Sequence, residues 1–183
     1  MTLPFDHLRI IDFSQGVGGP MATMLFADFG AEVIKVEPPT GDRMKDAPGY
    51  LCWNRGKARL SLDVRTFDGL KAAKELIASA DVAVFDNPAG ELERLGLDGA
   101  TLAAAHPALI HAWLAPYAEH GRWTSLPTDE LLLSAVTASA HLQHSFEDQP
   151  VALITPQIGY AHATIAANAI AAALWERGQS GRG

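Results

Sequence analysis

Cysteine and aromatic residues are scarce in this chain, with one cysteine, Cys52, and an aromatic share of 8%. A single cysteine excludes the internal disulfide framework that stabilises many small secreted domains. Residues 1–9 lack the basic start and the apolar run of a signal peptide. We therefore expect a protein of the reducing cytoplasm.

Uninterrupted hydrophobic runs are also lacking. The longest apolar segment, 158–174, is rich in alanine and is interrupted by His162, Thr164 and Asn168. It falls short of the roughly 20 apolar residues that cross a bilayer. We predict a buried helix here and no membrane partner.

Positive charge is in deficit, because the net charge of the chain is -7. This balance disfavours a nucleic-acid partner. Residues 35–74 are an exception, since nine basic residues and five acidic residues give that stretch a charge of +4, against -11 for the rest. A local positive field suits a small phosphorylated ligand, although an ordinary solvated surface explains the same bias.

Short runs rich in valine and isoleucine alternate with helical patterns. We expect strands at 8–13, 31–37, 59–64, 81–85 and 109–114, and helices at 20–29, 68–78 and 98–105. This alternation predicts an α/β fold, a Rossmann-like doubly wound and mostly parallel sheet. From Asp129 onward the pattern changes to alanine-rich helices, and the length of 183 residues favours one domain over residues 1–183.

The loop after the first predicted strand contains Gly16, Gly18 and Gly19. A Rossmann dinucleotide fingerprint needs glycine where this chain has Met21, although Glu37 stands where a ribose-binding acid is expected. A small nucleotide-binding oxidoreductase is therefore one alternative. Glycines allow close approach of a ligand and the helix start offers free N–H groups to an anion, but a tight turn without a ligand explains the loop equally well.

Several longer motifs occur in a characteristic order. They read "LRIIDFSQGVGGPMATMLFADFGAEVIKVEPPTGD", "NRGKARLSLDV", "ADVAVFDNPAGELERLGL", "HPALIHAWLAPYAEHG" and "AAALWERGQSGRG". Together they resemble the family III CoA-transferases, the CaiB-BaiF family, from residue 8 to residue 183. The resemblance implies a Rossmann-like large domain, coenzyme A or an acyl-CoA as substrate, no metal, and interlocked chains that share their active sites.

The resemblance also implies particular contacts with CoA. The backbone of Val17 and Gly18 matches the loop that lies against CoA, and Arg65 and Arg94 match basic positions that reach it, although each is also a plausible surface residue. Asp86 departs from the family pattern and would place a negative charge near an anionic ligand.

The family's nucleophile is an aspartate that attacks the acyl-CoA thioester. Counting back from the final "GRG" places Gly159 at its position, and no Asp or Glu occurs between Pro150 and Trp175. The racemases of the family add a histidine in a G-H-D triplet, which is replaced here by residues 127–129. Asp129 is better explained as a helix N-cap.

Two further features bear on function. His141 and His144 are spaced for a shared metal, but no third ligand type accompanies them, so we expect no metal site. Family chains are about twice as long, so the resemblance describes an N-terminal half without the linker and small domain.

We expect a CoA-transferase component that forms a homo- or hetero-oligomer with another family III chain, which supplies the nucleophile. A catalytically silent CoA-binding or interaction module is the alternative.

Overall fold

Five short strands form one sheet in which every neighbouring pair runs parallel. They are β1 (Arg9–Asp12), β2 (Glu32–Glu37), β3 (Ala58–Ser61), β4 (Val82–Phe85) and β5 (Ile110–Trp113), in the order β3-β2-β1-β4-β5. The computed structural model describes residues 2–88, 90–115, 117, 121–124, 126–143 and 145–183. Part of the fourth family motif (residues 116 and 118–120) and His144 lie outside these residues.

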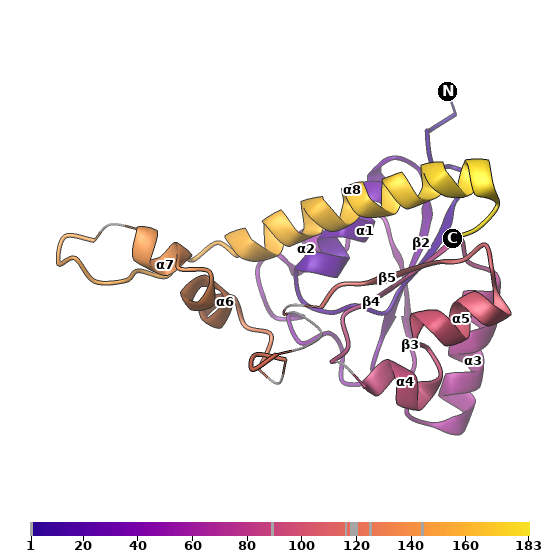
Figure 1. Cartoon of the computed structure of the whole chain (residues 1–183), viewed down its shortest axis with the longest axis horizontal. Helices are drawn as coiled ribbons and strands as arrows, with labels where there is room; N and C mark the ends of the chain where they lie inside the picture. The colour runs from indigo at the N-terminus through magenta and orange to yellow at the C-terminus, as the bar shows by residue number, and fades with distance from the viewer. Residues whose placement is uncertain (1, 89, 116, 118–120, 125, 144) are drawn as a thin grey trace.

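Helices connect and follow the strands (Figure 1). Their bounds are α1 Gly18–Asp28, α2 Tyr50–Trp53, α3 Phe67–Ala78, α4 Glu91–Leu95, α5 Gly99–Ala105, α6 Glu130–Val136, α7 Ser139–Leu142 and α8 Gln157–Ser180. The α/β fold predicted from the alternating pattern is confirmed, and the strand and helix positions agree to within a few residues. The one-turn helices α2 and α4 were not predicted, because four or five residues are too few to show a helical period.

Each face of the sheet is covered by its own hydrophobic core, because side chains alternate along a strand. Ile10 packs with α1 and α8 on one face. Its neighbour Ile11 packs with α3, α4 and α5 on the other. Both side chains are fully buried, so the adjacent apolar residues of each strand serve two layers, as in a doubly wound domain.

The strand order reverses between β1 and β4. From β1 the chain moves outward through β2 and β3, and it then returns to place β4 and β5 on the other side of β1. The loops that leave the carboxyl ends of β1 and β4 therefore diverge. In open α/β sheets ligands bind in the crevice at this point.

Helix α8, which is 24 residues long, packs along the 11-residue α1 (Figure 1). The prediction of a buried helix is wrong in part. Ala163, Ala166 and Ile170 are buried, whereas Ile165 and Trp175 are 68% and 74% exposed. By length and composition alone, α8 is able to cross a membrane. However, the apolar residues on the face of α8 that packs beside α1 belong to the hydrophobic core, so no bilayer is needed to explain that they are apolar.

Candidate functional site

Buried charges hold the loop of residues 13–17 between β1 and α1. The N–H of Gly16 donates to both carboxylate oxygens of Asp42, at 3.1 and 3.2 Å. The Lys35 ammonium, which is fully buried, donates to the carbonyl of Ser14 and lies 3.3 Å from Asp42 Oδ2. Gly16 has a φ of 81°, which a residue with a Cβ rarely adopts. The loop is therefore tied to β2 and to the loop after it.

Asp12, at the end of β1, also holds this loop in place. Its carboxylate accepts hydrogen bonds from the Ser14 N–H at 3.0 Å, the Thr23 hydroxyl at 2.7 Å and the Lys57 ammonium at 3.0 Å. Burial raises the pKa of Asp12, but Lys35, Lys57 and the two hydroxyls together outweigh it, so the pKa lies well below its usual range. Burial likewise lowers the pKa of Lys57.

The start of α1 approaches the start of α8 closely. A Cβ on Gly19 would lie 1.9 Å from Ser14 Oγ, so no larger residue fits there. A Cβ on Gly18 would lie 3.3 Å from His162 Nδ1, on the first turns of α8. Burial lowers the pKa of His162. The N-terminal ends of both helices therefore point toward one region of the molecule.

Three cavities surround this region. The glycine-loop cavity, about 340 Å³, lies between residues 15–19, Glu130, Gly159 and His162. The strand-end cavity, about 320 Å³, is lined by residues that follow β1, β2, β3 and β4. The apolar cavity, about 480 Å³, is lined mainly by residues of α6, by residues 47–49 and by residues 151–158.

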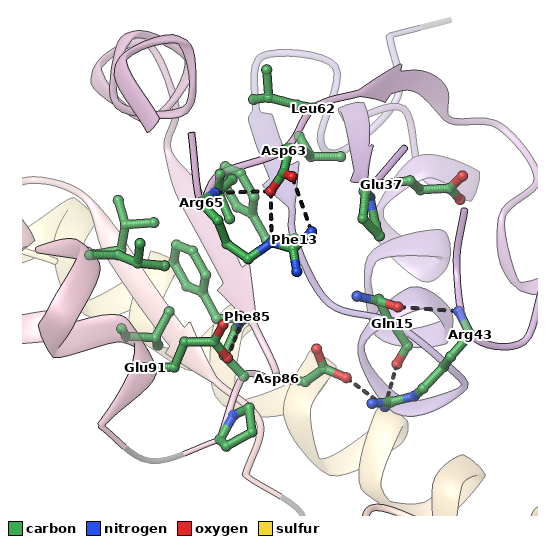
Figure 2. A pocket seen from close by; sticks show the side chains of 18 of the residues that line it. Phe13, Gln15, Glu37, Arg43, Leu62, Asp63, Arg65, Phe85, Asp86 and Glu91 are labelled. Atoms are coloured by element: carbon green, nitrogen blue, oxygen red, sulfur yellow. Dashed lines mark hydrogen bonds and ion pairs between the residues drawn. The ribbon is translucent and has the colours of Figure 1, made fainter. Parts of the chain in front are cut away.

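The strand-end cavity contains two arginines that already have acidic partners (Figure 2). Arg65 donates to both oxygens of Asp63, at 2.8 and 3.0 Å. Arg43 Nη2 donates to Asp86 Oδ2 at 2.7 Å and to the carbonyl of Gln15 at 2.9 Å. Because Glu37 and Glu91 also line the cavity, a phosphorylated ligand would have to draw the arginines away from their partners.

The Arg43–Asp86 pair lines both the strand-end cavity and the glycine-loop cavity. Burial raises the pKa of Asp86 to about 6, although Arg43 opposes this shift. The pair therefore separates two cavities that a long ligand would have to span, and Asp86 titrates close to neutral pH.

Internal partners account for much of the basic stretch noted in the sequence. Lys35 and Lys57 are in buried ion pairs, and Arg55 pairs with Asp28 at the surface. Together with the paired Arg43 and Arg65, these residues are five of the nine basic residues between 35 and 74. Most of that positive charge therefore stabilises the fold or meets a nearby acid.

The structure brings together some of the site residues expected from the sequence and separates others. Val17, Gly18 and Gly159 all line the glycine-loop cavity. Arg65 lines the strand-end cavity. Arg94 is exposed, its Nε donates to the carbonyl of Gly90, and it lines none of the three cavities. The contacts proposed for these residues with CoA stay predictions.

The prediction for Asp129 is confirmed, because its Oδ1 accepts from the N–H groups of Leu131 and Leu132 and caps α6. His141 lies at the end of α7. Within the described part of the chain, no three or more His, Cys, Asp or Glu residues are grouped to hold a metal ion.

Glu130 is the site residue that the sequence did not reveal. Its carboxylate accepts from the N–H groups of Ile158 and Gly159, at 2.6 and 3.0 Å, across 28 and 29 residues. The sequence neighbours of Gly159, from Pro150 to Trp175, include no acid. A contact over this separation shows no periodic or local signal, so only the fold reveals it.

The parallel doubly wound sheet, with a glycine loop and helix start at its switch point, defines a Rossmann-like class of α/β proteins. Within that class the chain belongs to the CoA-transferases of family III, whose family model matches residues 5–183. This membership leaves the small oxidoreductase without support.

Known relatives agree with this assignment. The chain is 32% identical over 97% of its length to the probable fatty acyl-CoA transferase Rv3272 of Mycobacterium tuberculosis, of which it covers 48%. It is 31% identical over its whole length to the formyl-CoA:oxalate CoA-transferase of Streptomyces avermitilis, of which it covers 47%. A crystal structure of Rv3272 superposes with a TM-score of 0.91 and 33% identity, over 98% of this chain and 51% of that one. The chain thus spans about half the length of these relatives.

Proposed function

We propose that this chain forms the CoA-binding half of a family III transferase, which moves CoA between an acyl-CoA and a carboxylic acid. One observation carries the proposal. The family match extends over residues 5–183, and within it the glycine loop faces the start of α8 across the glycine-loop cavity. In this arrangement the backbone of Val17 and Gly18 borders CoA, and the strand-end cavity takes its nucleotide end.

Arg65 is the proposed phosphate contact in the strand-end cavity. On binding, its guanidinium would leave the Asp63 carboxylate and donate to a phosphate of the ligand. Arg94 would require a larger movement to take the same role. Calorimetry with CoA, comparing the wild type with Arg65→Ala and Arg94→Ala, tests both assignments. We expect saturable binding that weakens several-fold in Arg65→Ala, whereas absence of CoA binding by the wild type would overturn the proposed function.

The acyl group is best accommodated in the apolar cavity. Trp53, Leu153, Ile154 and Ile158 line it, and none of its described lining residues is Lys, Arg or His. A second carboxylate on the acyl group would have no cation to meet there, and burying it unpaired is costly. The name of Rv3272 as a probable fatty acyl-CoA transferase supports an apolar acyl group, and competition between octanoyl-CoA and succinyl-CoA as donors tests it.

A second family III chain is the proposed partner. The outer face of α8 exposes Ile165 and Trp175, and a second chain packed on this face would remove their apolar surface from water. We expect homo- or hetero-oligomers in the cytoplasm, where the exposed Cys52 stays reduced. Analytical ultracentrifugation of the chain alone and with a candidate partner chain tests the assembly, and a monomer under both conditions would contradict it.

A silent CoA-binding module is the second candidate, and Gly159 is the observation that favours it. Glycine has no side chain with which to attack a thioester. CoA binding without CoA transfer, in the presence of every partner chain that associates with this one, would favour this second function.

A further inference from the structure

The side chain of Glu130 reaches from the first turn of α6 to the first turn of α8. Asp129 already caps α6, so Glu130 is not needed for that role. Instead its two oxygens accept from consecutive N–H groups of α8, Oε1 from Ile158 and Oε2 from Gly159. Two charge-assisted hydrogen bonds, placed at the positive end of a 24-residue helix, hold this carboxylate in one orientation.

The carboxylate lies where a side chain at position 159 would extend. A Cβ built on Gly159 would be 3.3 Å from Glu130 Oε2 and 3.1 Å from the Val17 side chain. An aspartate at this position would extend its carboxyl carbon a further ~1.5 Å beyond Cβ. Glu130 and an acid at position 159 therefore compete for one location, and in this chain Glu130 occupies it.

Glu130 is also placed between the two cavities that the proposed substrate needs. It lines both the glycine-loop cavity and the apolar cavity, and its side chain is neither fully buried nor fully exposed. In an acyl-CoA, the thioester joins the polar CoA arm to the acyl chain. A substrate with one part in each cavity brings this thioester to the carboxylate between them.

We propose that Glu130 is the carboxylate that accepts the acyl group in this chain, in place of the acid missing at position 159. The proposal rests on the CoA-transfer function proposed above. It differs from the expectation drawn from the sequence, in which a partner chain supplies the nucleophile, because the nucleophile then comes from this chain. Each Glu130 oxygen accepts one N–H bond and keeps a lone pair for attack.

The reaction balances without another reactant. A Glu130 oxygen attacks the thioester carbonyl, and the C–S bond breaks with its electrons leaving on the CoA thiolate, which gives a mixed anhydride. The thiolate then attacks the Glu130 carboxyl carbon. The bond from that carbon to the bridging oxygen breaks, the first carboxylate leaves, and a glutamyl-CoA thioester remains.

The acceptor carboxylate reverses this sequence. Its oxygen attacks the glutamyl thioester, and the C–S bond breaks to release the CoA thiolate and form a second anhydride. Attack of the thiolate on the acyl carbon of the acceptor yields the new acyl-CoA and restores Glu130. The N–H groups of Ile158 and Gly159 supply positive charge where negative charge develops on the Glu130 oxygens.

Trapping the intermediate tests the assignment. The chain, with any partner that co-purifies, is incubated with octanoyl-CoA, reduced with borohydride and digested for mass spectrometry. We expect a reduced glutamyl thioester on the peptide that contains Glu130. Glu130→Gln should abolish the adduct and lower transfer at least 100-fold, whereas Glu147→Gln, which changes an exposed acid outside the three cavities, should alter neither.

An exchange of positions provides a second test that does not depend on Glu130→Gln alone. Gly159→Asp in the wild type should gain no adduct at residue 159, because the two carboxylates compete for one site. Glu130→Ala combined with Gly159→Asp should recover an adduct at residue 159. Circular dichroism and CoA titration of each variant show that folding and CoA binding persist.

The outcomes separate the two proposals. If Glu130→Gln transfers CoA as fast as the wild type, the nucleophile lies elsewhere and the inference fails, while the proposed function stands. If the wild type binds CoA but forms no adduct at Glu130, the inference also fails. If the wild type does not bind CoA at all, the proposed function fails first.

Discussion

Replacing Lys35 with methionine removes an ammonium from the centre of the buried charge network. The Lys35 side chain is fully buried and lies 3.3 Å from Asp42 Oδ2 and 4.0 Å from Asp12 Oδ1. Methionine fills a similar volume but leaves Asp42 without this partner. Removing one member of a buried ion pair costs about 3–5 kcal/mol, because the remaining charge is buried and uncompensated.

The lower end of that range is expected here. Asp12 keeps Lys57 as a partner at 3.0 Å, and Asp42 keeps hydrogen bonds from the N–H groups of Gly16 and Met44. We therefore expect Lys35→Met to lower the free energy of unfolding by about 3 kcal/mol, a large part of the roughly 5–15 kcal/mol typical of a domain.

Urea denaturation followed by tryptophan fluorescence measures this loss. Lys71→Met is the matched control, because Lys71 is exposed on α3 and should change the free energy of unfolding by no more than about 0.5 kcal/mol. A Lys35→Met variant within about 1 kcal/mol of the wild type, with an unchanged denaturant slope, would refute the reasoning.

The same network predicts the response to acid. The pKa of Asp12 is held below its usual value, so the stability that Asp12 contributes is complete above the pKa of an unfolded aspartate, 3.8, and is lost as the pH falls below it. Since Lys35 is one cause of that low pKa, the Lys35→Met variant should lose less stability than the wild type when the pH is lowered below 4.

Three further predictions concern the site. Asp86→Asn should bind CoA several-fold more tightly at pH 7.5, since Arg43 becomes free for a phosphate. Because the pKa of Asp86 in the folded state is raised to about 6, the wild type should also gain stability relative to Asp86→Asn as the pH falls from 7.5 to 5. Denaturation at both pH values measures this difference, and a loss of relative stability at pH 5 would contradict the prediction. Asp129→Ala should cost about 1 kcal/mol through loss of the α6 cap, measured by thermal melting against the exposed control Asp46→Ala. Equal losses in the two variants would contradict the cap. Gly16→Ala should lower the free energy of unfolding by about 1 kcal/mol or more and weaken CoA binding. The reason is that φ at this position is 81° and the new Cβ would lie 2.9 Å from Arg43 Nε. Unchanged CoA binding by calorimetry would show that the conformation of this loop does not matter for CoA binding.

The positions of the strands and of the longer helices were predictable because they depend on local periodicity. Ile10 and Ile11 belong to an apolar run that serves both faces of a parallel sheet, and such runs identify buried strands directly. The exposed face of α8 was not predictable in the same way. Its alanine-rich sequence has no strong polar side, so the sequence did not show which residues would lie against α1 and which, such as Trp175, would face outward.

The charges were harder to interpret than the elements. A count of basic residues between 35 and 74 suggested a free positive field, whereas Lys35 and Lys57 are buried in ion pairs and Arg65 pairs with Asp63. Composition records how many charges a segment has. It does not record the distance from each charge to its nearest opposite charge, which determines whether a ligand can use it.

The sequence by itself determined the class of fold, the family motifs and the absence of any Asp or Glu between Pro150 and Trp175. Each of these follows from residue identity and spacing along the chain. Only the tertiary structure placed the Glu130 carboxylate at the N–H groups of Ile158 and Gly159. That contact depends on α6 lying beside the start of α8 (Figure 1). Packing between separate helices is decided by their side-chain surfaces in three dimensions, which no local pattern encodes.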